Sequence, residues 1–445
     1  MRTITLHTII ALSVALAVQL GMGTSPSAQE VVTDNDTGVG ARAMGMGGAQ
    51  AAAVNDITAV IHNPAALARI TSFEAQFGLD LWKRKVNTAL ASSRGPGKTT
   101  SNTDFSGIGT LGFAYPVPTD RGSLVFAASY NRVKDFTGRF RADGYSDILA
   151  GNFTGESIED GGLGIYSLAG AVDISPNISL GASLDVWSGN YTRDNRQLLN
   201  DASASYSQLD LNGVDDTITA VSFKPAFLYF RDNVRVGGYL RLPMTFHIEE
   251  RNYDEGYVRE DGGYFRLYEF VDPSSDFNDI YSRDRMTYRI SAPMQFAFGI
   301  ALGRPGRTML ALDANYENWK QGKLKYPADY FAEPTYFLDK YRTTVSWKVG
   351  IEQPLPFLGS VVRAGYMRHP LTFKGPKGYS DGSPPIVVTN ERDYLTFGFG
   401  AEFDRTFRMD AGYARGFWSS EENPRIDKES RNNLYVSLTY CSPGK

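Results

Sequence analysis

Apolar and polar residues alternate in many short segments of the chain after residue 71. In residues 72–82 (SFEAQFGLDLW) one face carries Phe73, Ala75, Phe77, Leu79 and Leu81. The residues between them are polar or small: Glu74, Gln76, Gly78 and Asp80. Because the side chains of a strand point alternately to its two faces, such a segment can place one face in lipid and the other toward a polar interior.

Fourteen segments have this pattern, each of about 8–13 residues, the length that a tilted strand needs to cross the hydrocarbon layer. They are residues 72–82, 106–115, 122–131, 164–174, 178–187, 220–230, 234–242, 290–302, 307–317, 343–352, 360–368, 394–403, 407–415 and 433–440. We expect these segments to form strands of one antiparallel sheet.

The connections between the segments are alternately short and long. Short ones, such as residues 116–121 (PVPTDR) and 175–177 (SPN), are rich in turn-forming residues, whereas long polar ones include residues 243–289 and 318–342. Outer-membrane barrels place short turns in the periplasm and long loops outside. The sequence therefore predicts an all-β, 14-stranded antiparallel transmembrane barrel over residues 72–441, with both termini in the periplasm. A soluble sandwich or propeller is the alternative, but it would not explain the paired connections.

Residues 1–28 read as an export signal. Arg2 and His7 precede an apolar run from Ile9 to about Leu20, which small residues follow where a peptidase could cut. The alternative is a membrane anchor, but the run is shorter than the roughly 20 residues that a spanning helix needs. We expect cleavage, export and residence in a bacterial outer membrane.

Composition excludes several kinds of chemistry. The chain has a net charge of −4 and one cysteine, Cys441, so it has no internal disulfide and no cysteine metal site. The histidines outside the signal, His62, His247 and His369, are far apart in sequence. No nucleophile elbow, phosphate-binding loop or zinc motif is present. We therefore expect no enzyme activity, no catalytic residue, no metal, no cofactor and no nucleic-acid partner.

Between the signal and the first strand, residues 38–70 are rich in Gly and Ala and lack strand alternation. They contain the runs GARAMGMGGA (residues 40–49), Asn55-Asp56 and NPAAL (residues 63–67). This segment resembles the N-terminal segment of the FadL/TodX/PorV superfamily of outer-membrane proteins. The rest of the chain matches that superfamily only in architecture, and it departs from it by ending in Cys441 to Lys445 rather than on an aromatic residue.

The resemblance implies that residues 29–71 fold into the barrel as a hatch. The residues that carry this motif are Gly40, Arg42, Gly45, Gly47, Gly48, Asp56, Asn63, Pro64 and Ala65. A barrel of this strand number has a lumen too wide for its own side chains to fill, which agrees with a plug. Pro64 can start a helical turn with Asn63 as its cap. Inward glycines of the strands could make room for the plug: Gly78, Gly181, Gly237, Gly350, Gly398, Gly400 and Gly412. A flexible periplasmic tail is the alternative.

Two of the long loops carry many aromatic residues. The candidate ligand-binding residues are Tyr257, Tyr264, Phe265, Tyr268, Phe270, Trp319, Tyr330, Phe331, Tyr336 and Phe337. Exposed apolar surface of this extent marks a binding groove or interface, although the same residues could instead pack as a lid or a girdle. Pro225 and Pro293 lie inside predicted strands and donate no ladder hydrogen bond, so each should mark a bulge or gap in the wall.

These features predict passive uptake of hydrophobic small molecules, such as fatty acids or aromatic hydrocarbons, through a plugged barrel. The alternative is a PorV-like protein that binds and shuttles secreted cargo, because the hatch motif occurs in both branches of the superfamily. A general polar pore is disfavoured by the hatch. The expected partners are the hydrophobic ligand, outer-membrane lipid with lipopolysaccharide, and the barrel-assembly machinery during biogenesis. The sequence leaves the substrate, the position of any lateral opening and the oligomeric state open.

Overall fold

The structure, a computed structural model, describes most of the chain after residue 38. The described residues are 39–90, 94, 97–146, 151–201, 207–260, 263–269, 284–304, 306–326, 336–356, 359–372, 386–388, 391–404, 406–422 and 425–442. The predicted signal peptide and the first part of the predicted hatch lie outside these ranges and stay predictions.

Five short helices of the described residues lie in the N-terminal segment and in the connection between β13 and β15. They are α3 (Ala41–Gly45), α4 (Ala59–His62), the 3₁₀ helices η1 (Pro64–Arg69) and η2 (Trp319–Gln321), and α5 (Tyr336–Lys340). The predicted cap of η1 is confirmed: the helix begins at Pro64, and Asn63 Oδ1 accepts a hydrogen bond of 3.1 Å from the Ala65 amide. No helix in the described part of the chain has the length and hydropathy needed to cross a membrane.

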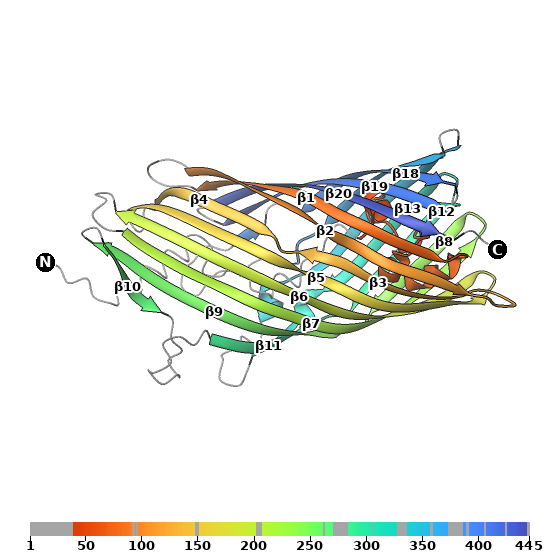
Figure 1. The fold of residues 1–445 in the computed structure, drawn as a ribbon, viewed down its shortest axis with the longest axis horizontal. Coiled ribbons are helices and arrows are strands. Elements are labelled where there is room, and N and C mark those ends of the chain that lie inside the picture. The colour runs from red at the N-terminus through yellow and green to blue at the C-terminus, as the bar shows by residue number, and fades with distance from the viewer. Residues whose placement is uncertain are drawn as a thin grey trace.

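The strands make one sheet (Figure 1). They are β1 (Glu74–Leu90), β2 (Gly97–Val117), β3 (Leu124–Asp135), β4 (Gly138–Ser146), β5 (Gly151–Ser175), β6 (Ile178–Asp201), β7 (Ser207–Arg231), β8 (Val234–Arg241), β9 (Met244–Glu260), β10 (Gly263–Glu269), β11 (Asp284–Ala292), β12 (Gln295–Gly303), β13 (Met309–Asn318), β14 (Lys323–Lys325), β15 (Thr343–Leu355), β16 (Ser360–His369), β17 (Ile386–Val388), β18 (Arg392–Phe403), β19 (Phe407–Glu422) and β20 (Arg425–Cys441).

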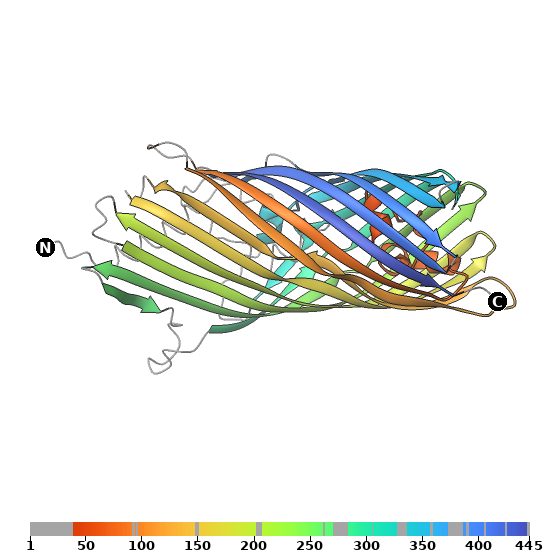
Figure 2. The same ribbon diagram turned by 45° about the horizontal axis from the view of Figure 1, so that its top comes forward.

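The sheet closes on itself as an antiparallel barrel. Neighbouring wall strands pair in antiparallel fashion; β7 pairs with both β8 and β9, which in turn pair with β12 and β11. β1 pairs with β20 from Glu74 opposite Cys441 to Leu90 opposite Arg425, and this pairing closes the barrel. Figure 2 shows the tilted strands passing around an elongated cylinder.

The predicted number of fourteen strands is wrong, because the wall contains sixteen strands among the described residues, with short additional strands beside them. The difference arises at two prolines. Pro243 separates β8 from β9, and Pro293 separates β11 from β12. Each proline lacks the amide hydrogen that a ladder needs, so a chain segment that continues in one direction is divided into two strands.

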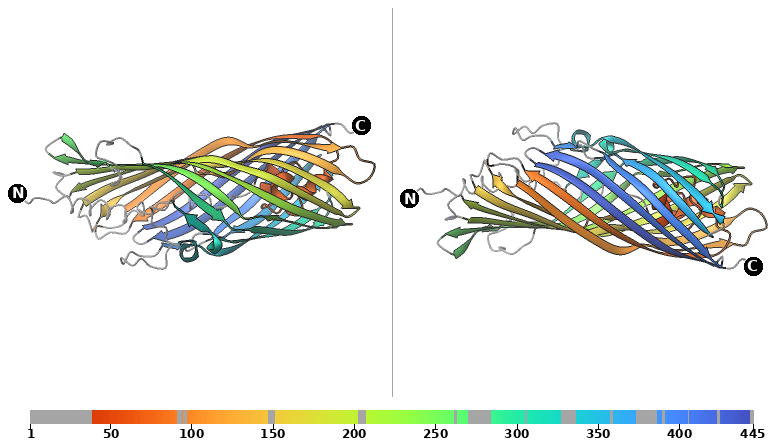
Figure 3. Two further views of the ribbon diagram at one scale, coloured as in Figure 1. Left: turned by 90° about the horizontal axis from the view of Figure 1, so that it is seen from below. Right: turned by 90° about the horizontal axis from the view of Figure 1, so that it is seen from above.

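Several predicted long loops are also continuations of strands. The predicted loop 243–289 contains β9, β10 and the start of β11, and the predicted loop 132–163 contains β4 and the start of β5. As a result β5, β6 and β7 have 25, 24 and 25 residues, whereas β13 and β16 have 10 each. The barrel is thus taller on the side of β5 to β9 than on the side of β13 to β18, as the views in Figures 1 and 3 show.

Burial follows the alternation of the sequence at the level of β8 and β12. On β12, Phe296, Phe298, Ile300 and Leu302 are exposed on the outer face, whereas the residues between them are buried. Comparable apolar residues are exposed on the outer faces of the other wall strands, for example Phe397 and Phe399 of β18. This apolar band is the surface that a bilayer would cover.

Candidate functional site

Residues 39–70 lie inside the barrel, close to the end where the short turns join the strands (Figure 3). Helix α3 contacts β16, β18, β19 and β20, whereas η1 contacts β3, β5, β6 and β7. The segment therefore reaches opposite parts of the wall, and nearly all of its residues are buried. We call residues 39–70 the N-terminal segment.

At one end of the N-terminal segment, Arg42 joins a buried network of charges. Its guanidinium donates to Glu352 of β15 at 2.9 and 3.2 Å, and to the Gln50 side chain and the Ala53 carbonyl at 2.9 and 3.1 Å. Arg363 of β16 donates to the same Glu352 at 2.8 Å. Because a buried charge needs partners, this network ties the segment to the wall.

The network continues along the wall to β19. Arg363 also donates to Asp410 at 2.7 Å, and the guanidinium of Arg408 lies 3.4 Å from the same carboxylate. Asp56 of the N-terminal segment lies in the field of these cations: burial alone would raise its pKa, but Arg408, Arg42 and hydrogen bonds from Thr58 hold it below its ordinary value. Asp56 is therefore a carboxylate at neutral pH.

At the other end, polar side chains of the wall hold backbone groups of the segment. Asp313 of β13 accepts hydrogen bonds from the Gln50 and Ala51 amides at 2.6 and 2.7 Å. The ammonium group of Lys224 on β7 donates to the Ile61 carbonyl at 2.8 Å, and Arg69 forms an ion pair with a carboxylate of β5, Asp173. The motif residue Asn63 donates to the Phe227 carbonyl of β7 at 3.0 Å.

Glycines of the wall let the segment backbone approach closely. Those whose missing side chain would meet the N-terminal segment are Gly181, Gly237, Gly299, Gly350, Gly365, Gly398 and Gly412. Six of them stand opposite one another on neighbouring strands, as the pairs Gly237 and Gly299, Gly350 and Gly365, and Gly398 and Gly412.

The fit at these pairs is tight. A Cβ atom on Gly398 would lie 2.9 Å from the Cα atom of Gly45, so no side chain fits there. Two of the glycines expected to make room for the segment, Gly78 and Gly400, instead face side chains of the wall. Gly299 and Gly365 were not anticipated from the sequence.

Above the N-terminal segment, a large group of apolar side chains lies inside the barrel. One cluster of buried residues combines inward side chains of β5, β6, β7, β9 and β11 with residues near η2 and α5, and Ile61 of the N-terminal segment packs against it. Its larger members are Phe136, Leu163, Ile165, Trp187, Tyr191, Ile218, Phe246, Ile248, Tyr288, Ile290, Trp319, Phe337 and Tyr341. We call this cluster the apolar compartment.

Aromatic contacts hold the apolar compartment together. Trp187 and Phe246 meet edge to face with ring centres 5.8 Å apart, as do Phe136 and Tyr191. Phe337 of α5 lies 4.7 Å from Tyr341 between ring centres. All of these are contacts between side chains. Packed side chains, rather than a stretch of backbone, therefore fill the compartment.

The floor of the apolar compartment is cationic. Lys224 lies 3.7 Å from Asp185 and close to Arg241, whose guanidinium stands over the Trp187 ring at 5.4 Å. The Nε atom of Arg241 is buried and has no hydrogen-bond partner. Ser167 and Ser183 also donate to Asp185, at 2.6 and 3.1 Å. The floor therefore offers a donor beside a large apolar surface.

The wall is interrupted at the level of this floor. Arg241 of β8 pairs with Gln295 of β12, and Met244 of β9 pairs with Ala292 of β11, so the two breaks in the strands face each other. The intervening Leu242 and Met294 are 38% and 43% exposed on the outer face.

The pairing of the neighbouring strand β7 is interrupted at the same level. It pairs with β9 through Thr219 and with β8 only from Ala226 onward, so residues 220–225 lie outside both ladders. One backbone hydrogen bond, from the Leu242 amide to the Phe223 carbonyl at 3.0 Å, crosses this interval. Pro225 lies in the interval, and Pro293 lies in the break between β11 and β12. Pro243 was not singled out from the sequence.

Two of the predicted aromatic residues are buried in the apolar compartment, and the side chains of the others lie outside the described part of the chain. Trp319 and Phe337 are buried in the apolar compartment, 3% and 2% exposed, with ring centres 6.1 Å apart. The structure places Tyr257 on β9, Tyr264, Phe265 and Tyr268 on β10, and Tyr336 at the start of α5, but the side chains of these five lie outside the described part. Phe270, Tyr330 and Phe331 lie outside the described residues altogether.

The residues that sequence reasoning missed are the inward apolar side chains of β9 and β11. A signal was present, because Met244, Phe246 and Ile248 alternate with the polar Thr245, His247 and Glu249. In this stretch the apolar side chains are buried, whereas on β12 the large apolar side chains are exposed. We predict a loop here from the sequence, and strand β9 shows that this prediction is wrong.

Comparisons with known proteins agree with the fold. No protein-family model matches the chain, and no curated protein matches it in sequence. Among solved structures, a FadL homologue from Pseudomonas aeruginosa is 16% identical with a TM-score of 0.60, covering 91% of this chain and 99% of that chain. The toluene transporter TodX of P. putida is 14% identical with a TM-score of 0.58, covering 92% and 100%.

The monoaromatic hydrocarbon channel CymD is 15% identical with a TM-score of 0.54, covering 92% of this chain and 98% of that chain. The resemblance to FadL-type proteins that residues 38–70 indicated is thus confirmed as a likeness of fold along nearly the whole chain. In addition, no group of three or more His, Cys, Asp or Glu side chains in the described part could hold a metal ion.

Proposed function

We propose that this protein carries hydrophobic small molecules passively across a bacterial outer membrane. The observation that carries the proposal is the apolar compartment, because a large aromatic and aliphatic cluster inside a barrel of this type is a suitable environment for apolar molecules. The neighbouring folds, a FadL homologue and channels for toluene and other monoaromatic hydrocarbons, support a channel rather than an enzyme.

The N-terminal segment acts as the hatch in this proposal. It occupies the lumen below the apolar compartment and is held by ion pairs and backbone hydrogen bonds on opposite sides of the wall. Such a plug blocks polar solutes, which is what a channel for apolar molecules requires. In this arrangement both termini face the periplasm and the aromatic loops face outward, where they gather the ligand.

The cationic floor favours a ligand with an anionic head. A carboxylate placed near Arg241 and Lys224 would accept hydrogen bonds, while its acyl chain would lie against Trp187 and Phe246. A neutral hydrocarbon would gain only the apolar contacts. We therefore favour a fatty acid over an aromatic hydrocarbon as the substrate.

Uptake by proteoliposomes tests this function. Vesicles that contain the protein should take up a labelled long-chain fatty acid faster than protein-free vesicles, and faster than they take up a small polar sugar. Toluene should enter with less dependence on Arg241 than the fatty acid does, so an Arg241→Gln variant separates the two substrate classes. Equal fatty-acid uptake with and without protein would overturn the proposal. A barrel that purifies without any apolar molecule but with a stoichiometric exported protein would support the cargo-shuttle alternative.

The break beside Pro225 and Pro293 is the proposed exit for the ligand. It lies at the level of the floor, where backbone pairing lapses, and Leu242 and Met294 face outward at its edge. A double variant Leu242→Trp with Met294→Trp should slow fatty-acid uptake severalfold by covering the break. Leu302→Trp, on the same outer face of β12 but away from the break, is the control. Unchanged uptake in the double variant would remove this exit while leaving transport through the barrel intact.

A further inference from the structure

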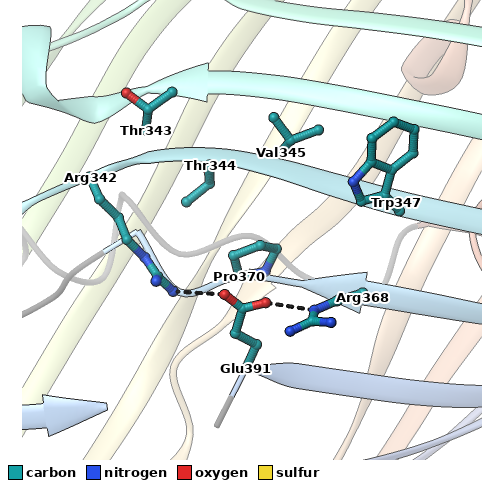
Figure 4. Close-up of a pocket in the computed structure, with 8 residues that line it drawn as sticks. All are labelled: Arg342, Thr343, Thr344, Val345, Trp347, Arg368, Pro370 and Glu391. Atoms are coloured by element: carbon teal, nitrogen blue, oxygen red, sulfur yellow. Dashed lines mark hydrogen bonds and ion pairs between the residues drawn. The ribbon is translucent and has the colours of Figure 1, made fainter. Parts of the chain in front are cut away.

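A pocket lies on the outer surface of the barrel, on the short side of the wall (Figure 4). It is formed where the chain enters β15 and leaves β16, at the end opposite the short turns. Directly below it on β15, Val349 and Ile351 are 45% and 39% exposed and belong to the apolar outer band. The pocket thus stands at the upper border of the band that a bilayer would cover, where lipid headgroups begin.

The pocket contains two arginines around one carboxylate. Arg368 donates to Glu391 through Nε at 2.6 Å, and a terminal nitrogen of Arg342 lies 3.6 Å from the other oxygen of Glu391. Arg342 is further fixed by donating through Nε to the Leu371 carbonyl at 2.6 Å. Glu391 holds the two guanidinium groups side by side, and Asp393 of β18 is the cross-strand neighbour of Arg368 on its other side.

The terminal nitrogens of Arg368 remain available as hydrogen-bond donors. Its side chain is 52% exposed, and its terminal nitrogens make no hydrogen bond within the described part of the chain. A guanidinium with one edge fixed by a carboxylate and the other edge free is arranged to receive a second oxyanion.

Aromatic side chains mark the same level as a membrane interface. Trp347 lines the pocket and is 50% exposed beside its cross-strand neighbour Arg368. Tyr366, 38% exposed on β16, donates to Asp393 at 2.8 Å. Trp and Tyr concentrate where headgroups meet hydrocarbon, because their rings are apolar and their polar ends reach water.

We propose that this pocket binds a phosphate group of an outer-leaflet lipid. The phosphate would accept hydrogen bonds from the terminal nitrogens of Arg368, beside the Glu391 carboxylate that occupies the space between Arg368 and Arg342. The lipid chains would descend along Trp347, Val349 and Ile351. Phosphorylated lipid A is the headgroup that fits, since it presents phosphates at the level of the sugar and acyl chains just below. This inference rests on the proposed outer-membrane location but not on the transported substrate.

Titration of the purified barrel with lipid A tests the site. The probes are lipid A that carries both phosphates and the same lipid after removal of the phosphates, with binding followed by native mass spectrometry and by the shift in melting temperature. The intact protein should prefer the phosphorylated lipid. Arg368→Gln should weaken that binding about tenfold, which corresponds to about 1.4 kcal/mol, and should leave the dephosphorylated lipid unaffected.

Matched variants keep the outcome decisive. Arg289→Gln changes an exposed arginine on the outer face of β11 and should bind like the unmodified protein. Arg368 makes only a surface ion pair, so its variant folds even if Arg342→Gln does not.

Equal binding of the two lipids, or equal loss in the Arg289 and Arg368 variants, would overturn the proposal. Competition by inorganic phosphate at millimolar concentration would do so as well, since the site would then serve a free anion. Fatty-acid uptake should be unchanged in Arg368→Gln, which separates failure here from failure of the transport function.

Discussion

The lower and upper parts of the lumen are filled in different ways, although the same strands line both. On β6, Gly181 faces the backbone of the N-terminal segment, Asp185 lies at the boundary, and Trp187 and Tyr191 face the apolar compartment above. Below the boundary the backbone of the N-terminal segment fills the barrel, whereas above it the packed side chains of the apolar compartment fill it.

A lumen filled by backbone and a lumen filled by side chains require different residues in the wall. Backbone brings amides and carbonyls into the lumen, so the lower wall must supply polar partners such as Asp313 and glycines such as Gly398 that allow close approach. Side chains bring no such groups, and an aromatic filling can change rotamers where a hydrogen-bonded backbone cannot. The lower part is thus held by backbone hydrogen bonds and the upper part by packed side chains, which agrees with the roles of plug and ligand-accepting region that we propose for them.

The largest expected effect concerns the charge network of the lower part. Arg42→Met should leave Glu352 buried with one of its two guanidinium partners lost, which costs about 3–5 kcal/mol in buried ion pairs. The loss should appear as faster amide hydrogen exchange in residues 39–70 while the wall strands stay protected. Arg42→Met combined with Glu352→Met should recover part of the loss. If exchange in the segment were unchanged, the network would not be what fixes the plug.

The next effect concerns the glycine contacts. Gly398→Val should push the segment away from the wall, because the nearest atom is the Cα of Gly45 rather than a flexible side chain. Overpacking of this kind costs about 1–3 kcal/mol. Single-channel recording should show a higher conductance to small ions than in the unmodified protein. Gly170→Val is the control, since its nearest neighbour is the Phe126 ring at 3.4 Å, and an equal rise in conductance there would refute the role of the contact.

The upper part can be probed with two adjacent residues of β9. Phe246 is buried in the apolar compartment, 1% exposed, whereas His247 is exposed on the outside of the same strand. Phe246→Ser should reduce fatty-acid uptake by about tenfold, since burying a phenyl group contributes about 1.5–3 kcal/mol. His247→Ser should have no effect on uptake. Similar uptake by both variants would mean that the compartment does not lie on the transport route.

The barrel could be predicted from the sequence because alternation in strands such as residues 394–403 is a local signal that the structure reproduces as β18. The number of strands could not, since it depended on whether Pro243 and Pro293 each bend one strand or divide it into two. That outcome is set by the pairing of β8 and β9 with β12 and β11, which lie some 50 residues away along the chain. Local composition does not report such pairing.

The apolar compartment was missed for a different reason. Alternation in residues 244–251 was visible, but which face looks inward depends on whether lipid or water surrounds the strand. Above the membrane the outside is aqueous, so Thr245 and His247 face out and Phe246 faces in. Only the position of this stretch relative to the apolar band of β8 and β12 reveals the reversal. The roles proposed for the loop aromatics, by contrast, rest on the sequence for all but Trp319 and Phe337.

The smallest expected effect is a dependence on pH that belongs to the lower part alone. His62 donates from Nε2 to the Val39 carbonyl at 2.8 Å, and burial, with Lys348 and Lys224 nearby, lowers its pKa to about 4.

A histidine released from the segment would have a pKa of about 6.5. Between these two values the released state binds more protons, so attachment of the segment should weaken as the pH falls from 7 to 5, by at most about 1.4 kcal/mol for each pH unit. Asp56 does not contribute in this range, because its pKa lies below the ordinary value of a carboxyl group. Hydrogen exchange of residues 39–70 at pH 7 and pH 5 measures the difference, and His62→Gln should reduce it while Phe246→Ser leaves it in place. An undiminished pH dependence in His62→Gln would assign the titration to another group and leave the plug itself insensitive to His62.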